Sequence, residues 1–569
     1  MAPPASHILH NRATRVFRVA SPDVRLMNDA FAEDPKPPFA RRKPPAVAMT
    51  AAVMPARGLR DRNVLFGALA ALAWLAFSIG LRPLSMPEEG RYVGVAWEML
   101  RSGDWLVPTE NGLPFFHKPP LFYWLTAASL RIFGVSEAPA RFASLLAATV
   151  GAIALYRLAG RWVGERTARW IVLVLVTEPF FFGAAQFANL DLLVATCIAV
   201  AILLIAHAVF LIRHGKPYLA ALMGAWAAAA LGVLAKGLIG IVLPGLVVFV
   251  WLIVTGQARL LLKLLSPAAF AVFLAIAAPW FIGVQMRHPG FAHFFFIYQH
   301  FERFTAGGFN NVQPWWFLIA VAPALTLPWS LWLLGSTFRP RAGETAEARL
   351  WRQLMWTWLI TVLAFFSIPQ SKPIGYVMPV LFPIAALAAE AIVHRLRPGA
   401  SAPRNAVIGS AVLAVLICVI TVVYTLLTYA RDDTALAHEL ARQRAPGDPT
   451  VFVGEYLFDI PIHARLTEPV PVIANWNDPE IARHDNWRRE LAEAAPFSPA
   501  LAATLLVDAE HGFALRCGAA PLWAVVKIGD EAPVAALPGA TRVVVSNRIA
   551  LWRIAAADCA PVGAKATQP

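Results

Sequence analysis

The chain has 569 residues, of which 58% are hydrophobic and 15% are charged. Soluble domains carry roughly 25% charged residues and are less than half apolar, so this composition excludes an ordinary soluble domain and indicates a membrane protein. The 49 Lys and Arg outnumber the 35 Asp and Glu, but they lie in loops that flank apolar stretches and not in a run among exposed aromatic residues. This pattern argues against nucleic-acid binding. Four cysteines are also too few for disulfides to hold together a chain of this length, which excludes a disulfide scaffold.

Residues 1–62 precede the first apolar stretch. They are rich in Pro, Ala and Arg and show no helical periodicity. Such a segment cannot bury enough apolar surface to fold, so we expect a disordered basic tail.

Residues 63–430 contain the apolar stretches. A helix needs about 20 mostly apolar residues to cross a bilayer, and about eleven stretches come close to this length. They cover residues 63–82, 139–160, 168–187, 190–212, 218–235, 237–255, 264–284, 314–336, 352–368, 374–394 and 405–429. The predicted fold class is therefore a polytopic α-helical membrane protein.

The short loops between the stretches predict the orientation of the chain. Basic residues lie before the first stretch and in alternate loops after it, among them Arg57, Arg60, Arg161, Arg166, Arg213, Lys216, Arg259, Lys263, Arg339, Arg341 and Arg395. Because such loops stay on the cytoplasmic side, the N-terminus is predicted to be cytoplasmic. Residues 83–138, 285–313, 369–373 and the region after about 430 then lie outside, in the periplasm of a Gram-negative cell if the membrane is its inner membrane.

Residues 431–569 have a different composition. Short apolar runs at 451–453, 471–473, 505–507 and 543–545 alternate with polar helical stretches, which predicts a small external α/β domain. An oxidising compartment would allow Cys517 and Cys559 to pair, but the sequence gives no distance between them, and the pairing stays open.

The first external loop, 83–138, is unusually dense in polar groups. Its candidate site residues are Glu88, Glu89, Arg91, Tyr92, His117 and Lys118. The spacing of Glu88, Tyr92 and Trp97 predicts a short amphipathic helix on the membrane surface. An acidic pair alone is more typical of a solvated interfacial helix, so a functional interpretation depends on other segments that reach the same face.

Three further segments reach that face. Asp191 opens an apolar stretch, where it would face a cavity or cap the helix, and Lys236 interrupts another stretch, where it would bind an anion or snorkel. The remaining candidates are Tyr298, His300, Glu302 and Arg303 in the loop 285–313, with Lys372 and Tyr376 beyond it. For His300 the alternative is an interfacial histidine, and for Lys372 a snorkelling lysine.

These residues together predict a binding site for a lipid-linked phosphate. The cations Arg91, Lys118, Lys236, Arg303 and Lys372 would stabilise a phosphate at the bilayer boundary, and Glu88, Glu89 or Asp191 would supply a base. Tyr92, His117, Tyr298, His300, Glu302 and Tyr376 are candidates for binding a sugar or an anion. No nucleotide sugar is available outside the cell, and neither a P-loop nor a dinucleotide glycine pattern occurs. A polyprenyl-phosphate sugar is therefore the expected donor.

The same residues resemble a known family. The motifs Pro87-Glu88-Glu89-Gly90-Arg91-Tyr92 and Phe116-His117-Lys118-Pro119-Pro120 are similar to the first periplasmic loop of bacterial aminoarabinose transferases. These belong with the protein O-mannosyltransferases to the GT-C class of membrane glycosyltransferases. The similarity continues through Asp191, Lys236-Gly237, His300-Phe301-Glu302-Arg303-Phe304 and Ser371-Lys372-Pro373 to Tyr376, over about residues 63–395.

The resemblance implies an inverting transfer of a sugar from undecaprenyl phosphate to lipid A, another envelope glycan or a protein. By position, Glu88 matches the family's loop aspartate, Lys118 and Lys372 its donor-phosphate lysines, and Asp191 its acidic residue after the third span. Glu88 is one methylene longer than aspartate, so the role of base could pass to Glu89 or Asp191. His117 stands where the family commonly has Glu, which puts in question any metal site that uses that glutamate. The sequence assigns no cofactor, and a divalent metal on His117 and His300 is kept as an alternative.

Two rival functions make different predictions for the sequence. A transporter or flippase of lipid-linked sugars predicts charges at the membrane midplane and interrupted helices in matching halves, and the sequence indicates neither. A non-catalytic membrane binding protein that kept the fold is the other rival, and the sequence leaves it open.

Overall fold

The computed structural model describes residues 62–302, 311–339, 341, 343–396, 401–428 and 432–558. The predicted tail lies outside these residues except for Arg62, which begins α1, and Arg303 and Cys559 also lie outside them. The question whether Cys517 pairs with Cys559 therefore stays open.

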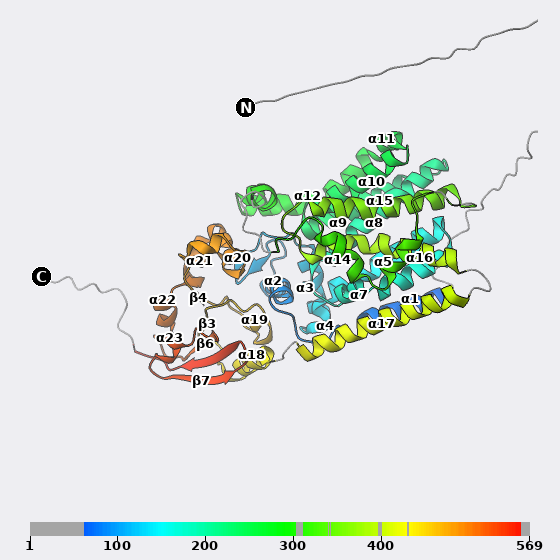
Figure 1. The fold of residues 1–569 in the computed structure, drawn as a ribbon. Coiled ribbons are helices and arrows are strands. Elements are labelled where there is room, and N and C mark those ends of the chain that lie inside the picture. The colour runs from blue at the N-terminus through cyan, green and yellow to red at the C-terminus, as the bar shows by residue number, and fades with distance from the viewer. Residues whose placement is uncertain are drawn as a thin grey trace, which may run out of the picture. The chain divides into compact units, whose positions relative to one another are not determined.

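Helices occupy the predicted apolar stretches (Figure 1). They are α1 (Arg62–Ala76), α5 (Phe142–Trp162), α6 (Glu165–Thr177), α7 (Pro179–Ala185), α8 (Leu190–Arg213), α9 (Leu219–Lys236), α10 (Ile239–Val254), α12 (Pro267–Arg287), α14 (Phe317–Leu325), η3 (Trp329–Gly335), α15 (Ala346–Ser367), α16 (Met378–Arg395) and α17 (Ser401–Thr428). In the described part of the chain, 6 helices are long and apolar enough to cross a membrane, or up to 8 if each bent pair counts as one span.

Two predicted spans are not single straight helices. The chain bends by 68° between α6 and α7 and by 107° between α14 and η3. At the first bend Glu178 is extended, because the residue before a proline is disfavoured in the helical region and Pro179 follows. At the second bend, Pro328 precedes η3. The predicted stretches 168–187 and 314–336 are therefore each occupied by a bent pair of helices.

The segment between α1 and α5 is folded. It contains α2 (Glu88–Ser102), a hairpin of β1 (Thr109–Glu110) and β2 (Leu113–Pro114), α3 (Leu121–Phe133) and α4 (Glu137–Ala140). The predicted helix forms as α2, but the expectation that it lies on a surface was wrong, because eight of its 15 residues, Glu89 and Tyr92 among them, are buried in the protein. Asn111 and Gly112 form the hairpin turn with φ of 51° and 76°, as two-residue turns of the sequence Asn-Gly prefer.

Short elements connect the later helices. They are η1 (Ala258–Leu260), α11 (Leu261–Leu264), the π-helical segment η2 (His293–Glu302) and η4 (Ile374–Val377). For residues 300–302 the backbone is described but the side chains are not.

The C-terminal region contains a six-stranded sheet in the order β5-β4-β3-β6-β8-β7. Its strands are β3 (Thr450–Val453), β4 (Val472–Ile473), β5 (Leu506–Val507), β6 (Leu522–Lys527), β7 (Ala540–Val545) and β8 (Ile549–Ile554). Strands β5, β4, β3 and β6 run parallel, and β8 pairs antiparallel with β6 and β7. The four predicted strands correspond to β3, β4, β5 and β7, whereas β6 and β8 were not predicted.

Helices accompany the sheet, so the region has the α/β character that was expected. They are α18 (Asp432–Gln443), α19 (Ile460–His463), η5 (Pro479–Ala482), α20 (Trp487–Ala494), η6 (Ala495–Phe497), α21 (Pro499–Leu505), α22 (Ala509–Phe513), η7 (Ala514–Arg516) and α23 (Ala532–Ala535). The core of this region includes Leu113 of the β1–β2 hairpin. Segments of the loop 83–138 therefore pack into the C-terminal region.

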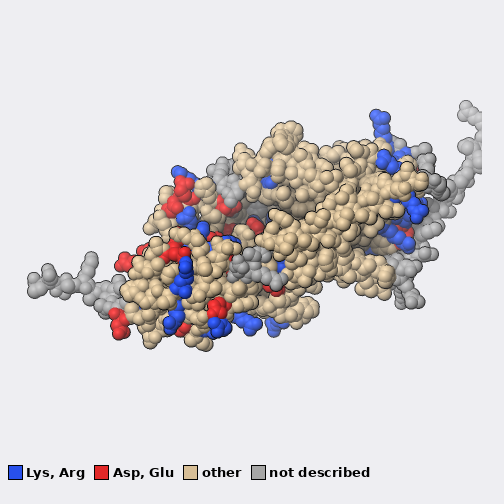
Figure 2. Space-filling view, turned by 60° about the horizontal axis from the view of Figure 1, so that its bottom comes forward, with Lys and Arg blue, Asp and Glu red and all other residues tan. Residues whose placement is uncertain are grey.

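Charged side chains are unevenly distributed (Figure 2). Lys and Arg predominate at the end of the helical region that lies away from the sheet, whereas basic and acidic side chains lie together at the sheet end. This is the distribution that the predicted basic cytoplasmic loops require.

Candidate active site

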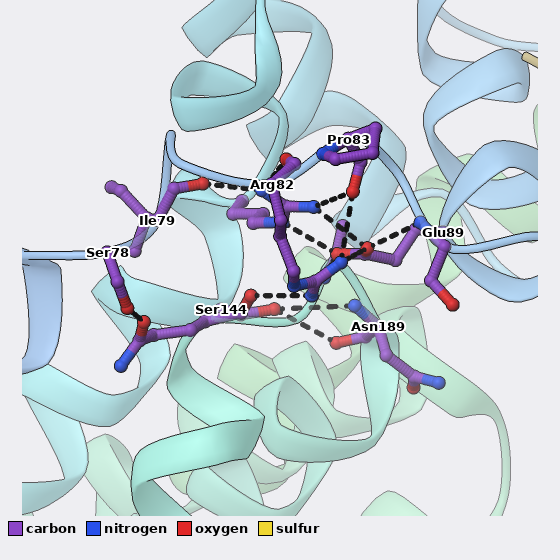
Figure 3. A network of polar contacts seen from close by, with 11 residues as sticks. Ser78, Ile79, Arg82, Pro83, Glu89, Ser144 and Asn189 are labelled. Carbon is purple, nitrogen blue, oxygen red and sulfur yellow. Dashed lines mark hydrogen bonds and ion pairs between the residues drawn. The ribbon is translucent and has the colours of Figure 1, made fainter. Parts of the chain in front are cut away.

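Glu89 lies at the start of α2 in a closed network of hydrogen bonds (Figure 3). Its carboxylate is fully buried and accepts from Arg141 Nε at 2.8 Å, from Arg141 Nη2 at 2.9 Å and from Arg82. The backbone N–H groups of Ser85 and Ala188 donate to it at 2.8 and 2.7 Å. Burial would raise the pKa of Glu89, but the two arginines hold it below its usual value. These contacts join α2 to α5 and to the chain before α8, and they surround the predicted base on all sides.

Glu88, by contrast, is half-exposed, with 48% of its side chain accessible. It accepts from Arg91 Nη2 at 3.0 Å, and Arg91 Nη1 donates to Glu490 of α20 at 2.5 Å. The Arg91 guanidinium also lies 4.9 Å from the centre of the Tyr92 ring. Arg91, a predicted donor-phosphate ligand, is thus already compensated by two carboxylates.

Asp191 forms an ion pair with Lys236. The N-cap of α8 is Asn189, whose side chain accepts from the Asp191 N–H at 2.7 Å. Because Asn189 fills the capping role that the sequence left open for Asp191, the Asp191 carboxylate is available for Lys236. Lys236 ends α9, and its ammonium lies 5.5 Å from the centre of the Tyr376 ring. Asp191, Lys236 and Tyr376 therefore meet, although they come from three different segments.

Tyr92 connects this group to the first external loop. Its side chain is buried, which raises its pKa, and its hydroxyl also responds to the charges of Arg91, Glu88, Asp191 and Lys236. Four predicted site residues therefore lie close enough to Tyr92 for their charges to act on its hydroxyl.

An apolar cavity of about 610 Å³ lies beside Asp191. Its walls come from α7, the start of α8, α14, η4 and α17, and most of its lining residues are hydrophobic. The polar side chains Arg82, Gln186, Asn189 and Asp191 also line it. A cavity with apolar walls and a few polar groups suits an amphipathic ligand.

Lys372 holds two loops together. Its ammonium donates to the carbonyl oxygens of Gln313 at 2.9 Å and Gln370 at 3.4 Å, and to that of Pro369. Its side chain is 3% exposed, and its backbone N–H donates to Asn311. To bind a donor phosphate, as the resemblance implies, Lys372 would have to give up carbonyl partners.

Glu493 of α20 lies beside two other predicted residues. Its carboxylate contacts His117 Nε2 at 2.8 Å and accepts from the Tyr298 hydroxyl at 2.8 Å. Burial would raise the pKa of Glu493, but His117, Arg489 and Tyr298 lower it to about 2. Glu490, Glu493 and Arg489 were all missed in the sequence, where a short charged helix looks like any solvated helix.

The remaining predicted residues are less fully placed. Lys118 is half-buried next to His117. The side chains of His300 and Glu302 and the whole of Arg303 lie outside the description. Among the described residues, no group of three or more His, Cys, Asp or Glu side chains is arranged to hold a metal ion. The alternative of a divalent metal on His117 and His300 is not tested, because the side chain of His300 lies outside the described residues.

Comparison with solved structures identifies the fold. The crystal structure of ArnT from Cupriavidus metallidurans bound to undecaprenyl phosphate superposes with a TM-score of 0.71 at 25% identity, covering 88% of this chain and 99% of that one. The chain has the GT-C fold of the aminoarabinose transferases. Residues 117–282 of this GT-C chain also match the family described as dolichyl-phosphate-mannose-protein mannosyltransferase. The resemblance stated from the sequence is confirmed.

Curated relatives agree with this assignment. The undecaprenyl phosphate-alpha-4-amino-4-deoxy-L-arabinose arabinosyl transferase of Pseudomonas savastanoi is 29% identical over 341 residues, which cover 60% of this chain and 62% of the relative. The enzyme of the same name from Aeromonas hydrophila is 32% identical over 322 residues, covering 56% and 58%. The matched part thus spans about three fifths of these relatives.

Proposed function

We propose that this GT-C protein is an inverting glycosyltransferase. It would move a sugar from a polyprenyl-phosphate donor to lipid A, another envelope glycan or a protein, at the periplasmic face of a bacterial inner membrane. The names of the relatives describe transfer from an undecaprenyl phosphate sugar, and the similar crystal structure holds undecaprenyl phosphate. Both support a lipid-linked donor for this chain.

One observation carries the proposal: the Asp191–Lys236 ion pair lies beside an apolar cavity of about 610 Å³. A polyprenyl-phosphate sugar has a long apolar chain and an anionic head. The apolar walls suit the chain, and the polar groups beside Asp191 suit the head. Of the predicted acids, Asp191 combines partial exposure, a cationic partner and a place in the cavity lining, whereas Glu89 is enclosed by arginines.

The proposed chemistry needs few groups. An acceptor hydroxyl attacks the anomeric carbon, the bond from that carbon to the phosphate oxygen breaks, and polyprenyl phosphate leaves with the bonding electrons. Asp191 takes the proton of the hydroxyl as general base. Lys236 stabilises the charge that develops on the leaving phosphate, with Lys118 as a second candidate. If the acceptor is itself a phosphate, no proton needs removal and Asp191 positions the acceptor.

The membrane arrangement is part of the proposal. About eleven helices would cross the bilayer, because each predicted stretch of about 20 residues coincides with a helix or a bent pair. The basic end of the helical region would face the cytoplasm. Residues 1–62 would form the cytoplasmic tail, residues 63–430 the transmembrane domain and residues 431–569 the periplasmic α/β domain.

The test is transfer of a radiolabelled sugar from its polyprenyl phosphate by the full-length protein in inner-membrane vesicles. We expect Asp191→Asn to lower kcat by about 100-fold or more, as loss of a general base does. The matched control is Asp508→Asn, which removes an exposed carboxylate paired with His511 and should leave the rate unchanged. Full activity of Asp191→Asn would rule out Asp191 as the base.

A further inference from the structure

Glu493 joins three segments that are distant in the sequence. His117 precedes α3, Tyr298 and Gln299 lie in η2, and Glu493 lies in α20. The two oxygens of Glu493 contact His117 Nε2 at 2.8 Å, the Tyr298 hydroxyl at 2.8 Å and Gln299 Nε2 at 3.3 Å. Arg489, one turn earlier in α20, donates to Glu493 at 2.6 Å and to the Tyr298 hydroxyl at 3.1 Å.

This junction is largely shielded from water. The side chains of His117, Arg489 and Glu493 are 5%, 8% and 14% exposed. Charged groups in such surroundings need their partners, because removal of one leaves the others desolvated and uncompensated. The hydrogen-bonding geometry of Glu493 therefore constrains both His117 and Tyr298.

Aromatic contacts hold the same three segments together. Phe497, just after α20, packs edge-to-face on Phe116 at 4.8 Å and on Phe294 at 5.6 Å between ring centroids. Phe116 also packs on Phe291 at 5.0 Å. The apolar contacts press the segments together without fixing their rotation, whereas the carboxylate hydrogen bonds are directional.

The constrained segments are those that the sequence predicts to bind substrate. Lys118 follows His117 directly, and His300 and Arg303 follow Tyr298 by two and five positions. Glu493 itself is already contacted by four protein side chains. It is therefore suited to orient the groups that bind substrate and not to bind substrate itself.

We propose that Glu493 is a positioning residue of the active site, which fixes the loop bearing His117 and Lys118 against η2. The C-terminal region thereby completes the site instead of only covering it. This inference rests on the proposed glycosyltransferase function. It also explains why position 117 is His, where the resemblance leads one to expect Glu. His117 can bind the carboxylate that Glu493 of α20 supplies, whereas a Glu at this position could not.

The test exchanges the two partners in the full-length protein. In His117→Glu two carboxylates face each other, and in Glu493→His two imidazoles face each other, so neither variant keeps the original pair. We expect each single variant to lower kcat/KM for the polyprenyl-phosphate sugar by about 10-fold or more, mainly through a higher KM, and the double variant to recover most of the loss, as coupled residues do. The control Glu480→His removes an exposed carboxylate paired with Arg483 and should have no effect.

Hydrogen exchange in the absence of substrate provides a second readout. Peptides covering residues 115–120 and 293–299 should exchange faster in both single variants and regain protection in the double variant. Unchanged exchange in the single variants, or a double variant no better than the singles in both measurements, would overturn the positioning role. If the wild-type protein transfers no sugar but the exchange pattern holds, the proposed function fails while the structural coupling by Glu493 is supported.

Discussion

The ammonium of Lys236 pairs with the carboxylate of Asp191, although 45 residues separate them in the chain. Lys236 lies at the last position of α9, before Gly237, which ends the helix with φ of 90°. Asp191 lies in the first turn of α8, where Asn189 caps the helix. Because α8 and α9 are consecutive helices that run antiparallel, the end of α9 meets the beginning of α8. The pair therefore follows from two helix ends that pack at the same level.

Gly375 lies against this pair. A Cβ atom at position 375 would overlap the Asp191 carboxylate, so Gly375→Ala should displace Asp191 from Lys236. We expect kcat to fall by about 10- to 100-fold, because small misplacements of reacting groups are costly. Transfer kinetics and thermal unfolding in detergent should be measured together. The control is Gly409→Ala in α17, where a Cβ atom meets no neighbour. An equal fall in both variants would contradict the prediction.

The Glu89 network should control stability. Glu89→Gln leaves the buried Arg141 guanidinium without its carboxylate, and breaking such a pair costs about 3 to 5 kcal/mol. Glu88→Gln removes a half-exposed carboxylate and should cost less than about 1 kcal/mol. Thermal unfolding followed by fluorescence in detergent compares the two variants. Similar unfolding temperatures for both would mean that Glu89 does not stabilise the loop.

The cavity can be narrowed from one wall. Gly183 lines it, and a Cβ atom at this position meets no neighbour, so Gly183→Leu should extend into the space. We expect KM for a polyprenyl-phosphate sugar to rise by about 10-fold, the usual scale for one or two displaced apolar groups. Gly245→Leu, in α10 and equally open, is the control. An unchanged KM in Gly183→Leu would argue that the donor chain lies elsewhere.

Asp459 should make the C-terminal region sensitive to pH. Burial, with a contribution from Asp433, raises its pKa from 3.8 to about 6. Because the folded value is the higher one, the stabilisation from this group is complete below pH 3.8 and is lost as the pH rises through 6. Asp459→Asn should therefore stabilise the region at pH 7 by about 2 to 3 kcal/mol.

At pH 4 the same substitution should have little effect. Pulse proteolysis of residues 432–558 in the full-length protein, at pH 7 and at pH 4 with a protease active at each, measures the difference. A gain of the same size at both pH values would show that the effect is not due to the charge of Asp459.

The sequence alone determined which segments become helices, because the length and hydrophobicity of an apolar stretch are local properties. It also predicted that Asp191 and Lys236 would reach one face of the membrane, since alternation of the spans fixes which ends share a side. The bends at Glu178-Pro179 and before η3 were missed, although prolines were present, because a proline can be accommodated in a helix when neighbouring groups compensate.

The tertiary structure decided which charged residues are available to a ligand and which are occupied by protein partners. Glu89 carries the same charge as Asp191, but Arg82 and Arg141 enclose it. Lys372 carries the same charge as Lys236, but backbone carbonyl oxygens bind its ammonium. Glu490 and Glu493 came to the site from a helix about 300 residues beyond Asp191. The sequence gives the charge of a side chain but not its partner. Since the partner is chosen by packing between distant segments, only the folded chain separates a residue that holds the site together from one that faces the ligand.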